Sequence, residues 1–412
     1  MYHPYHRQPG SRENQGTVIF EKTERLGMYF KKFIRKGMGI LNPINKALPK
    51  MEKRIVFYSN LGFRDNVKAV YDFAIQTELN KDYQIICACN DYKEYLNHQI
   101  ENVTFVSPEK GLLFFLTSKY FFYSFGKYPV KPSGNQMVVN LFHGTPLKTI
   151  GALNKNENHE RQDYFTCVLA ASPYFVPIMA QSFGVNEERV ALCGHARNDK
   201  LFDSNAKMQE YFKTSQYRRV FFWLPTFRKQ AGNKADSTQH TETKLSIFTD
   251  WNSLQQLNKH LSELQSLCII KLHPLQEWDQ EKNISFSNIL FFTHQSFIQE
   301  NLDLYEVLPI ADVLITDYSS VYFDYLLLDR PIGFTVDDIE SYQNTRGFVF
   351  DNPLEYMPGP KITDKDMFLQ FLELCCNGQD DFKQARQKIN DLCNYYQDGN
   401  NARRVLHLAG IL

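Results

Sequence analysis

The sequence predicts an α/β protein: two doubly wound parallel-sheet domains that face a central cleft, preceded by an N-terminal amphipathic extension. Three observations support this fold class. Apolar runs without polar alternation recur between helical patterns, which is typical of parallel strands covered on both faces. A second series of the same kind opens after residue 212. The chain has 412 residues, which suits two domains of moderate size.

Composition and charge exclude some classes of function. Hydrophobic residues make up 43% of the chain and charged residues 22%, which indicates folded cores. The 46 basic and 46 acidic side chains cancel, so we expect no nucleic acid partner and a local site for any anionic ligand. The eight cysteines form no CxxC pair and lie mostly in apolar runs, which favours buried reduced thiols and a cytoplasmic location. We find no signal peptide and no apolar stretch long enough to span a bilayer.

The extension, residues 1–50, differs from the rest of the chain. Residues 1–20 are polar and rich in Pro, Gly and His, so we expect a disordered tail. Residues 21–41 combine an apolar helical face with basic side chains. Such a helix can lie in an anionic membrane interface, where each basic residue adds about 1 kcal/mol. A helix packed on the body of the protein fits the segment equally well.

The first domain, residues 51–212, is expected to alternate strands and helices. Helical spacing occurs at 65–79 and 111–119. The strand candidates are RIVFYSN, YQIICACN, NVTFVSP, YFFYS, QMVVNLF, CVLAAS and RVALCG.

The second domain, residues 213–412, repeats this pattern. Helix candidates are 251–265 and 321–328, and the polar stretch 229–244 is expected to form a mobile surface loop near the cleft. The strand candidates are RRVFFWLPTF, LCIIKLHP, NILFFT, DVLITD and PIGFT. Two such series imply a cleft between two sheets.

Two histidines end apolar strands directly before turns. Ligands of open parallel sheets bind at the carboxyl ends of the strands, so these positions are candidates for function. His143 follows QMVVNLF and precedes Gly144 and Thr145, which suit a tight turn and a helix cap. His273 follows the strand that ends at Lys271. We expect the two histidines to face one another, with a catalytic role for at least one; a structural histidine is the alternative for each.

The turn DYSS lies between the strand ADVLIT and the helix VYFDYLLL. Helix N-termini present unpaired N–H groups and partial positive charge, which suit a phosphate, and serine hydroxyls add donors. Capping would explain one serine, so the pair favours a bound anion, with capping as the alternative. The candidate phosphate-binding residues here are Thr316, Asp317, Ser319 and Ser320.

Further candidates follow other strands. Thr226 and Arg228 follow FFWLP, and the guanidinium of Arg346 suits bidentate contact with a phosphate. Together with Lys271, these three complete the candidate donor site. The candidate acceptor or cleft residues are Gly144, Thr145, Lys148, Arg197, Asn198 and Asp199.

The motifs HGTPLK, LPTFR, KLHP, DVLITDYSSVYFDYLLLDRPIGF, RGF and PGP occur in this order. With them, the chain resembles the CDP-glycerol glycerophosphotransferase family of teichoic-acid and capsule polymerases, from about residue 51 to the C-terminus. DGNNARRVLHLAGI also resembles that family's closing helix. Residues 194–197 depart from the family pattern, with Gly-His-Ala-Arg in place of Gly-Tyr-Pro-Arg. The loop SNLGFRDN also departs from it, because it contains fewer glycines than its usual glycine-rich counterpart.

This resemblance implies a GT-B fold and a CDP-activated polyol as donor. The acceptor would be a growing polyol-phosphate or glycan chain, a lipid-linked chain among the alternatives. It also implies peripheral association with an anionic membrane surface at the cytoplasmic face of the cell membrane. By motif position, His143 and His273 are the catalytic pair, and Ser319, Ser320 and Arg346 contact the donor phosphates.

The mechanism that we hypothesise is attack of an acceptor hydroxyl on the β-phosphorus of the CDP-polyol, with CMP as leaving group. An imidazole that accepts the hydroxyl proton contributes ~10² to 10⁴ in rate, and we assign this role to His143. His273, Ser319, Ser320 and Arg346 would stabilise charge on the phosphoryl oxygens. No DxD motif stands at a strand end, so the sequence requires neither a metal nor another cofactor.

Two other functions remain open at this point. One is a hexosyltransferase of the same fold that uses a nucleotide sugar, and the other is a non-catalytic membrane-bound scaffold. Glycerol and ribitol donors, single addition and polymerisation, the choice of base between the two histidines, and the oligomeric state are also left open by the sequence.

Overall fold

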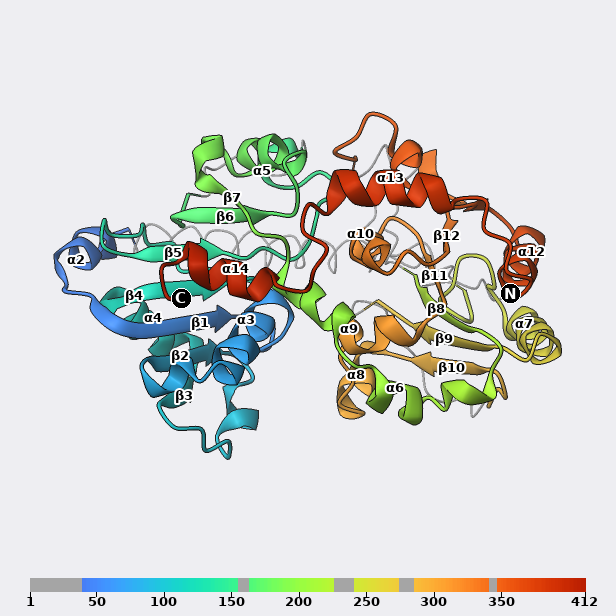
Figure 1. Ribbon diagram of the computed structural model, residues 1–412, viewed down its shortest axis with the longest axis horizontal. Coiled ribbons are helices and arrows are strands. Elements are labelled where there is room, and N and C mark those ends of the chain that lie inside the picture. The colour runs from blue at the N-terminus through green and yellow to red at the C-terminus, as the bar shows by residue number, and fades with distance from the viewer. Residues whose placement is uncertain (1–38, 155–162, 226–240, 274–284, 341–346) are drawn as a thin grey trace, which may run out of the picture.

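The protein has two lobes, each built on a parallel sheet covered by helices (Figure 1). The computed structural model describes residues 39–154, 163–225, 241–273, 285–340 and 347–412. The expected tail and most of the basic helix at 21–41 therefore lie outside the described residues, as does most of the expected loop at 229–244. The first described helix is α2 (Leu41–Ala47).

The N-terminal sheet has seven parallel strands in the order β3-β2-β1-β4-β5-β6-β7. The order reverses between β1 and β4, and ligands of such sheets bind beside that reversal. The strands are β1 (Met51–Ser59), β2 (Gln84–Cys89), β3 (Val103–Val106), β4 (Ser118–Tyr123), β5 (Met137–Asn140), β6 (Cys167–Ala170) and β7 (Val190–Leu192). Its helices are α3 (Asp65–Gln76), α4 (Pro108–Thr117) and α5 (Phe175–Phe183).

The C-terminal sheet has six parallel strands in the order β10-β9-β8-β11-β12-β13, so its reversal lies between β8 and β11. The strands are β8 (Val220–Leu224), β9 (Leu267–Lys271), β10 (Ile289–Phe292), β11 (Val313–Thr316), β12 (Ile332–Thr335) and β13 (Lys361–Ile362). Its helices are α6 (Ala206–Tyr211), α7 (Trp251–Glu263), α8 (His294–Gln299), α9 (Leu304–Val307), α10 (Val321–Tyr325), α12 (Lys365–Cys376) and α13 (Lys383–Cys393).

Continuous apolar runs form these strands because both faces of each sheet are covered. Along β1, Ile55 and Phe57 pack into a cluster with α3, while Val56 and Tyr58 pack on the other face with α4 and α5. In β8, Trp223 packs against α7 and α12 on the outer face of the second sheet. The cluster that contains Val56 continues through both lobes, so the two sheets share one hydrophobic core.

The closing helix α14 (Asn401–Leu408) returns to the first lobe. Figure 1 shows it lying over the N-terminal sheet, and Ala402, Val405 and Leu406 pack in the cluster that also contains α3. From the sequence we expect this helix within the second domain, residues 213–412, whereas in the structure it packs on the first. The apolar face of a helix does not reveal which sheet covers it.

The two-domain parallel fold is confirmed, and the eight cysteines are buried and free, as predicted. Differences are local. The helix expected at 321–328 ends as α10 at Tyr325 and continues as a 3₁₀ turn (Leu326–Leu328), and the short strand β13 was not expected. Within the described ranges, no helix is long and apolar enough to cross a membrane.

Candidate active site

The turn after β5 holds His143 between two residues with left-handed backbone. Phe142 has φ +54° and Gly144 has φ +116°. Such a conformation costs a non-glycine residue about 1–3 kcal/mol. Two asparagines hold Phe142 in place: Asn66 donates to its carbonyl over 3.0 Å, and its amide donates to Asn140 Oδ1 over 3.1 Å. The turn therefore fixes the position of the His143 backbone.

The His143 imidazole lies against two aromatic rings. Its ring stacks on Phe125 with 5.4 Å between centroids and contacts Phe142 at 4.0 Å. The side chain remains exposed on its outer side. Desolvation by the surrounding protein lowers the pKa of His143 to about 4; Asp65 opposes this shift and Arg197 adds to it. The imidazole is therefore neutral at pH 7 and able to accept a proton.

The His143 turn meets the DYSS turn of the other domain at Gly144. A Cβ atom on Gly144 would lie 3.5 Å from Ser320 Oγ and 2.3 Å from Nη2 of Arg197. Only glycine fits at this contact, because its φ is positive and the space is filled. The structure thus brings the turn that carries His143, after β5 of one sheet, next to Ser320 in the turn after β11 of the other.

The two serines of this turn are half-buried, and the Ser320 hydroxyl makes no capping hydrogen bond to α10. Capping therefore does not account for Ser320. The neighbouring Thr316 and Asp317 are fully buried, and the Thr316 hydroxyl donates to the carbonyl of Leu224 across the sheet over 3.0 Å. Thr316 thus joins β11 to β8.

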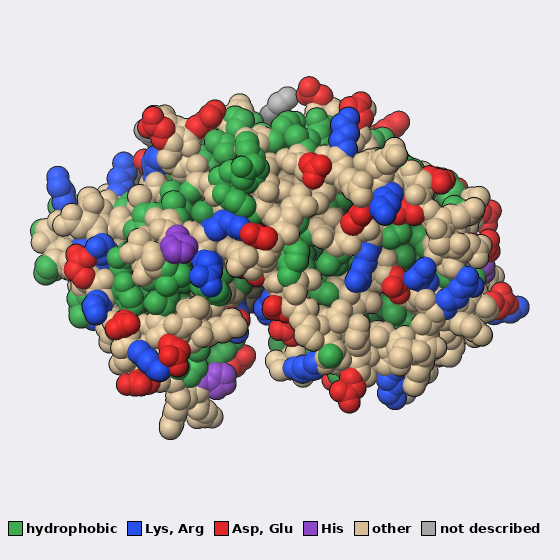
Figure 2. Space-filling view, viewed as in Figure 1, with side chains coloured by type: hydrophobic (Ala, Val, Ile, Leu, Met, Phe, Trp, Pro, Cys, Tyr) green, Lys and Arg blue, Asp and Glu red, His purple; other side chains and the backbone are tan. Residues whose placement is uncertain are grey.

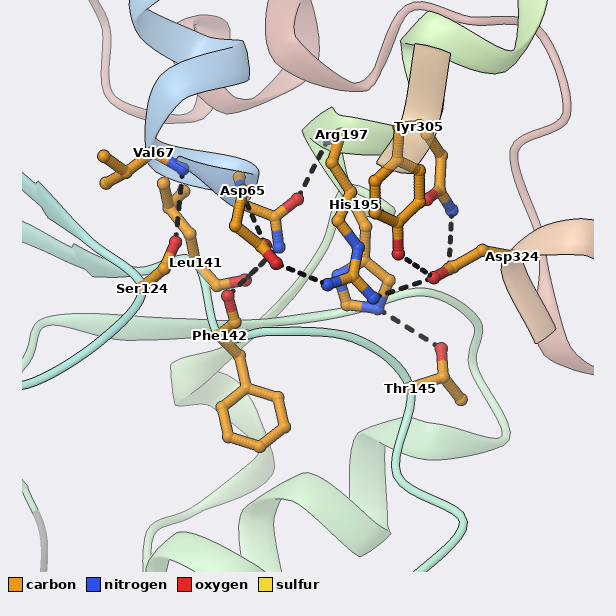
Figure 3. Close-up of polar contacts among 12 residues, drawn as sticks. Asp65, Val67, Ser124, Leu141, Phe142, Thr145, His195, Arg197, Tyr305 and Asp324 are labelled. Carbon is orange, nitrogen blue, oxygen red and sulfur yellow. Dashed lines mark hydrogen bonds and ion pairs between the residues drawn. The ribbon is translucent and has the colours of Figure 1, made fainter. Parts of the chain in front are cut away.

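A buried polar network joins the two lobes next to this contact (Figure 3). Arg197 donates from Nη1 to Asp65 Oδ2 and from Nη2 to Asp324 Oδ2, both over 2.7 Å. Asp324 also accepts from Tyr305 over 2.6 Å and from Asn198 over 2.9 Å. Burial alone would raise the pKa of Asp324, but Arg197 and these donors hold it below its usual value. Arg197 and Asn198 thus form buried polar contacts between the two lobes.

Two more candidates from the sequence lie in this buried region. The Thr145 hydroxyl lies 3.2 Å from Nε2 of His195 (Figure 3). Burial lowers the pKa of His195 to about 4, so the ring is neutral. The carboxylate of Asp199 accepts the backbone amides of Asn401 and Ala402 over 2.9 and 2.8 Å and so holds the start of α14. Its burial raises the pKa of Asp199 to about 6.

His273 follows β9 in a region rich in positive charge. Desolvation lowers the pKa of His273 to about 4, with Lys148, Lys271 and His294 adding to the shift. Lys148 comes from the first lobe and pairs with Phe348 of the second lobe in an isolated antiparallel β-bridge, so the two lobes approach here as well. Desolvation, with Arg64 as a second cause, lowers the pKa of Lys271 to about 8. The predicted residues Lys148, Lys271 and His273 therefore form one group.

Thr226, Arg228 and Arg346 lie outside the described residues. The residue after Arg346 is described: the Gly347 carbonyl accepts the backbone amide of Thr149 over 3.3 Å. Gly347 and Phe348 thus lie beside the segment that follows the His143 turn.

Several residues of this region were not predicted from the sequence. Asp324 carried a usable signal, because a single acid within the apolar helix VYFDYLLL requires a buried partner. Arg64 and His294 each follow a strand at its carboxyl end, so the rule that found His143 applies to them too. The roles of Asn66 and Tyr305 depend on contacts between distant segments and had no local signal.

Two parallel-sheet domains that meet at the His143 turn and the DYSS turn define a protein of the GT-B fold class. The model of the family described as CDP-Glycerol:Poly(glycerophosphate) glycerophosphotransferase matches residues 40–409, and the chain belongs to this family. It is therefore an enzyme, a glycerophosphotransferase. This confirms the resemblance found in the sequence.

Individual relatives agree with this assignment. A teichoic acid poly(glycerol phosphate) polymerase of Bacillus spizizenii is 26% identical over 408 residues, which cover 92% of this chain and 97% of the relative. A teichoic acid poly(ribitol-phosphate) polymerase of the same organism is 27% identical over 386 residues, 88% of this chain and 56% of that relative. The solved structure of the wall teichoic acid polymerase TagF shares the fold, with TM-score 0.71, 20% identity and coverage of 97% of this chain and 98% of that chain.

Proposed function

We propose that this enzyme transfers glycerol phosphate from CDP-glycerol to the terminal hydroxyl of a poly(glycerol phosphate) chain in teichoic-acid synthesis. The family and the Bacillus spizizenii poly(glycerol phosphate) polymerase support this donor and acceptor. The observation that supports the proposal is the contact at Gly144, where the turn that carries the neutral imidazole of His143 meets the Ser320 hydroxyl of the other lobe.

In the proposed reaction, the acceptor oxygen forms a bond to the β-phosphorus of CDP-glycerol. The bond between this phosphorus and the bridging oxygen breaks, and CMP leaves with the electron pair. His143 takes the proton of the attacking hydroxyl, which an imidazole with a low pKa does in its neutral form. The product is a phosphodiester, and the protonated His143 returns its proton to water.

Charge on the phosphoryl oxygens requires donors that are in place before the reaction. We assign this role to Ser319, Ser320 and Lys271 in the described part of the second lobe, together with His273. We add Arg346, Thr226 and Arg228 to this set because of their positions in the sequence motifs. The half-buried hydroxyl of Ser320 suits this role because it is not used in capping.

Release of CMP from CDP-glycerol in the presence of a poly(glycerol phosphate) acceptor tests the role of His143. We expect His143→Ala to lower kcat by ~10²- to 10⁴-fold with an unchanged melting temperature. His260→Ala, on α7 beside Glu373, is the matched control and should retain full turnover. Near-normal turnover of His143→Ala would remove this residue from the mechanism.

The choice of donor is tested by offering CDP-glycerol, CDP-ribitol and a UDP-sugar separately. CDP-ribitol is the informative comparison, because one relative is a poly(ribitol-phosphate) polymerase. We expect CDP-glycerol to give the highest kcat/KM. Release of UDP alone would identify a hexosyltransferase, and no release from any donor would favour a scaffold.

We also propose that the enzyme acts at the cytoplasmic face of the membrane on a lipid-linked acceptor. The basic amphipathic pattern of residues 21–41 supports this proposal. The full chain should sediment with vesicles that contain anionic lipid, and a variant that lacks residues 1–38 should stay in the supernatant. Equal binding of both forms contradicts a role for the segment.

A further inference from the structure

Arg64 reaches from the first lobe to the second. It precedes α3, in the loop after β1, and its Nη1 lies 3.0 Å from Nε2 of His294 at the start of α8. Its guanidinium also lies over the ring of Phe125, 5.9 Å from the centroid. Phe125 stacks on His143, so Arg64 and the proposed base lie against the same aromatic ring. Neither Arg64 nor His294 belongs to the donor site proposed above.

The charges around this contact are positive. Lys271 lies against the ring of Phe297 on α8, and Arg64 and Lys271 both contribute to lowering the pKa of His294 to about 4 after desolvation. Within the described part of the chain, neither Arg64 nor Lys271 forms an ion pair with a carboxylate. Asp91, near the same loop, accepts the backbone amide of Phe63.

Uncompensated cations that are partly desolvated and come from two lobes are costly in the absence of an anion. A phosphate group relieves this cost, since an arginine and a lysine provide N–H donors and neutralise its charge. The contact with His294 also fits this use: a neutral imidazole accepts from Arg64 and holds the guanidinium in place without neutralising it.

We infer that Arg64, held in place by His294, forms an anion site for the phosphodiester that precedes the terminal hydroxyl of the acceptor chain, next to Lys271 of the donor site. The inference rests on the proposed function. Arg64 lies on the lobe that carries His143, and by way of Phe125 its guanidinium lies within about 11 Å of the His143 ring. The base and the phosphate-binding group are therefore near enough to act on the hydroxyl and on the phosphate of one terminal glycerol unit. The site therefore selects an acceptor whose terminal unit is linked through phosphate.

Binding of a short oligo(glycerol phosphate), measured by calorimetry without donor, tests the site and needs no turnover. We expect Arg64→Gln to weaken binding about tenfold to a hundredfold, and His294→Ala to weaken it less. Arg64→Lys should retain part of the affinity. It also tests the inference if the Arg64→Gln variant does not fold. Arg54→Gln is the matched control, because Arg54 also lies over a phenylalanine ring, Phe114, and belongs to β1. Equal binding by wild type and Arg64→Gln overturns the inference.

Kinetics separate this site from the donor site. In CMP release, Arg64→Gln should raise KM for the acceptor at least tenfold and change the Kd for CDP-glycerol less than threefold. An equal loss of affinity for CDP-glycerol assigns the cluster to the donor instead and overturns the inference. No turnover by the wild type with any acceptor would refute the proposed function, while the calorimetric result would still decide whether the anion site exists.

Discussion

Arg197 and Asp324 form a buried ion pair between the two lobes, with 2.7 Å between Nη2 and Oδ2. Asp324 is fully buried, and the Arg197 side chain is 7% exposed. The pair packs against the His143 turn, since a Cβ atom on Gly144 would lie only 2.3 Å from the same Nη2 atom. Arg197 thus contacts both the other lobe and the turn that carries His143.

Loss of this arginine should affect both stability and activity. Removing one partner of a buried pair typically costs about 3–5 kcal/mol, so we expect Arg197→Met to lower the free energy of unfolding by that amount. It should also lower kcat, because the turn at Gly144 loses its support. Urea unfolding and CMP release measure the two effects.

Arg386→Met provides the control for this comparison. Arg386 is 1% exposed and pairs with Asp380 at 2.6 Å, in the second lobe and away from the His143 turn. We expect similar destabilisation with unchanged kcat below the melting temperature. If both variants lose activity in proportion to stability, Arg197 has no positioning role.

Adding a methyl group at Gly144 should disturb the same contact. Gly144→Ala forces a side chain into positive φ and places its Cβ 2.3 Å from Arg197 Nη2, so Arg197 must move. We expect at least a tenfold fall in kcat and a lower melting temperature. Gly134→Ala has open space around its Cβ and should leave both unchanged. Full activity of Gly144→Ala would show that the turn tolerates displacement.

Ser320→Ala should separate ligand binding from helix capping. Because the Ser320 hydroxyl makes no capping bond, we expect an unchanged melting temperature and a weaker affinity for CDP-glycerol, by roughly threefold to tenfold. Ser107→Ala should do the reverse: its hydroxyl accepts the Lys110 amide at the start of α4, and caps are worth about 1 kcal/mol. Titration calorimetry and thermal melts of both variants test this contrast.

The pH profile of activity should reflect the lowered pKa of His143. With a pKa of about 4, the imidazole stays neutral down to mildly acidic pH and is protonated below it. We therefore expect kcat/KM for CMP release to stay level from pH 8 to about 5 and to fall below that. An acidic limb centred near 6.5 would indicate that the imidazole is not desolvated.

Buried His195 should make stability depend on pH. The unfolded chain binds a proton below about pH 6.5, whereas the folded protein resists protonation until about pH 4. The free energy of unfolding is therefore lost as pH falls through this window, by about 3 kcal/mol from this residue. Urea unfolding at pH 7 and pH 4.5 should show a smaller decrease for His195→Gln than for the wild type, and identical decreases contradict this account.

Local patterns in the sequence predicted most of the fold. The apolar runs of β1 and β8 are buried on both faces, so their composition alone identifies them, and strand ends located His143, His273 and the DYSS turn. The two-residue strand β13 is too short to give a pattern. The contact between Arg64 and His294 joins residues 230 positions apart, and it follows from how the lobes pack rather than from either segment.

The return of α14 to the first lobe means that the chain passes between the lobes twice, once around residues 196–206 and again at 394–401. Two connections restrict sliding and separation of the lobes more than a single connection would, and they add to the shared core and the buried Arg197–Asp324 pair. The turn that carries His143 and the serine-bearing turn are thereby held in one alignment by covalent as well as packing constraints.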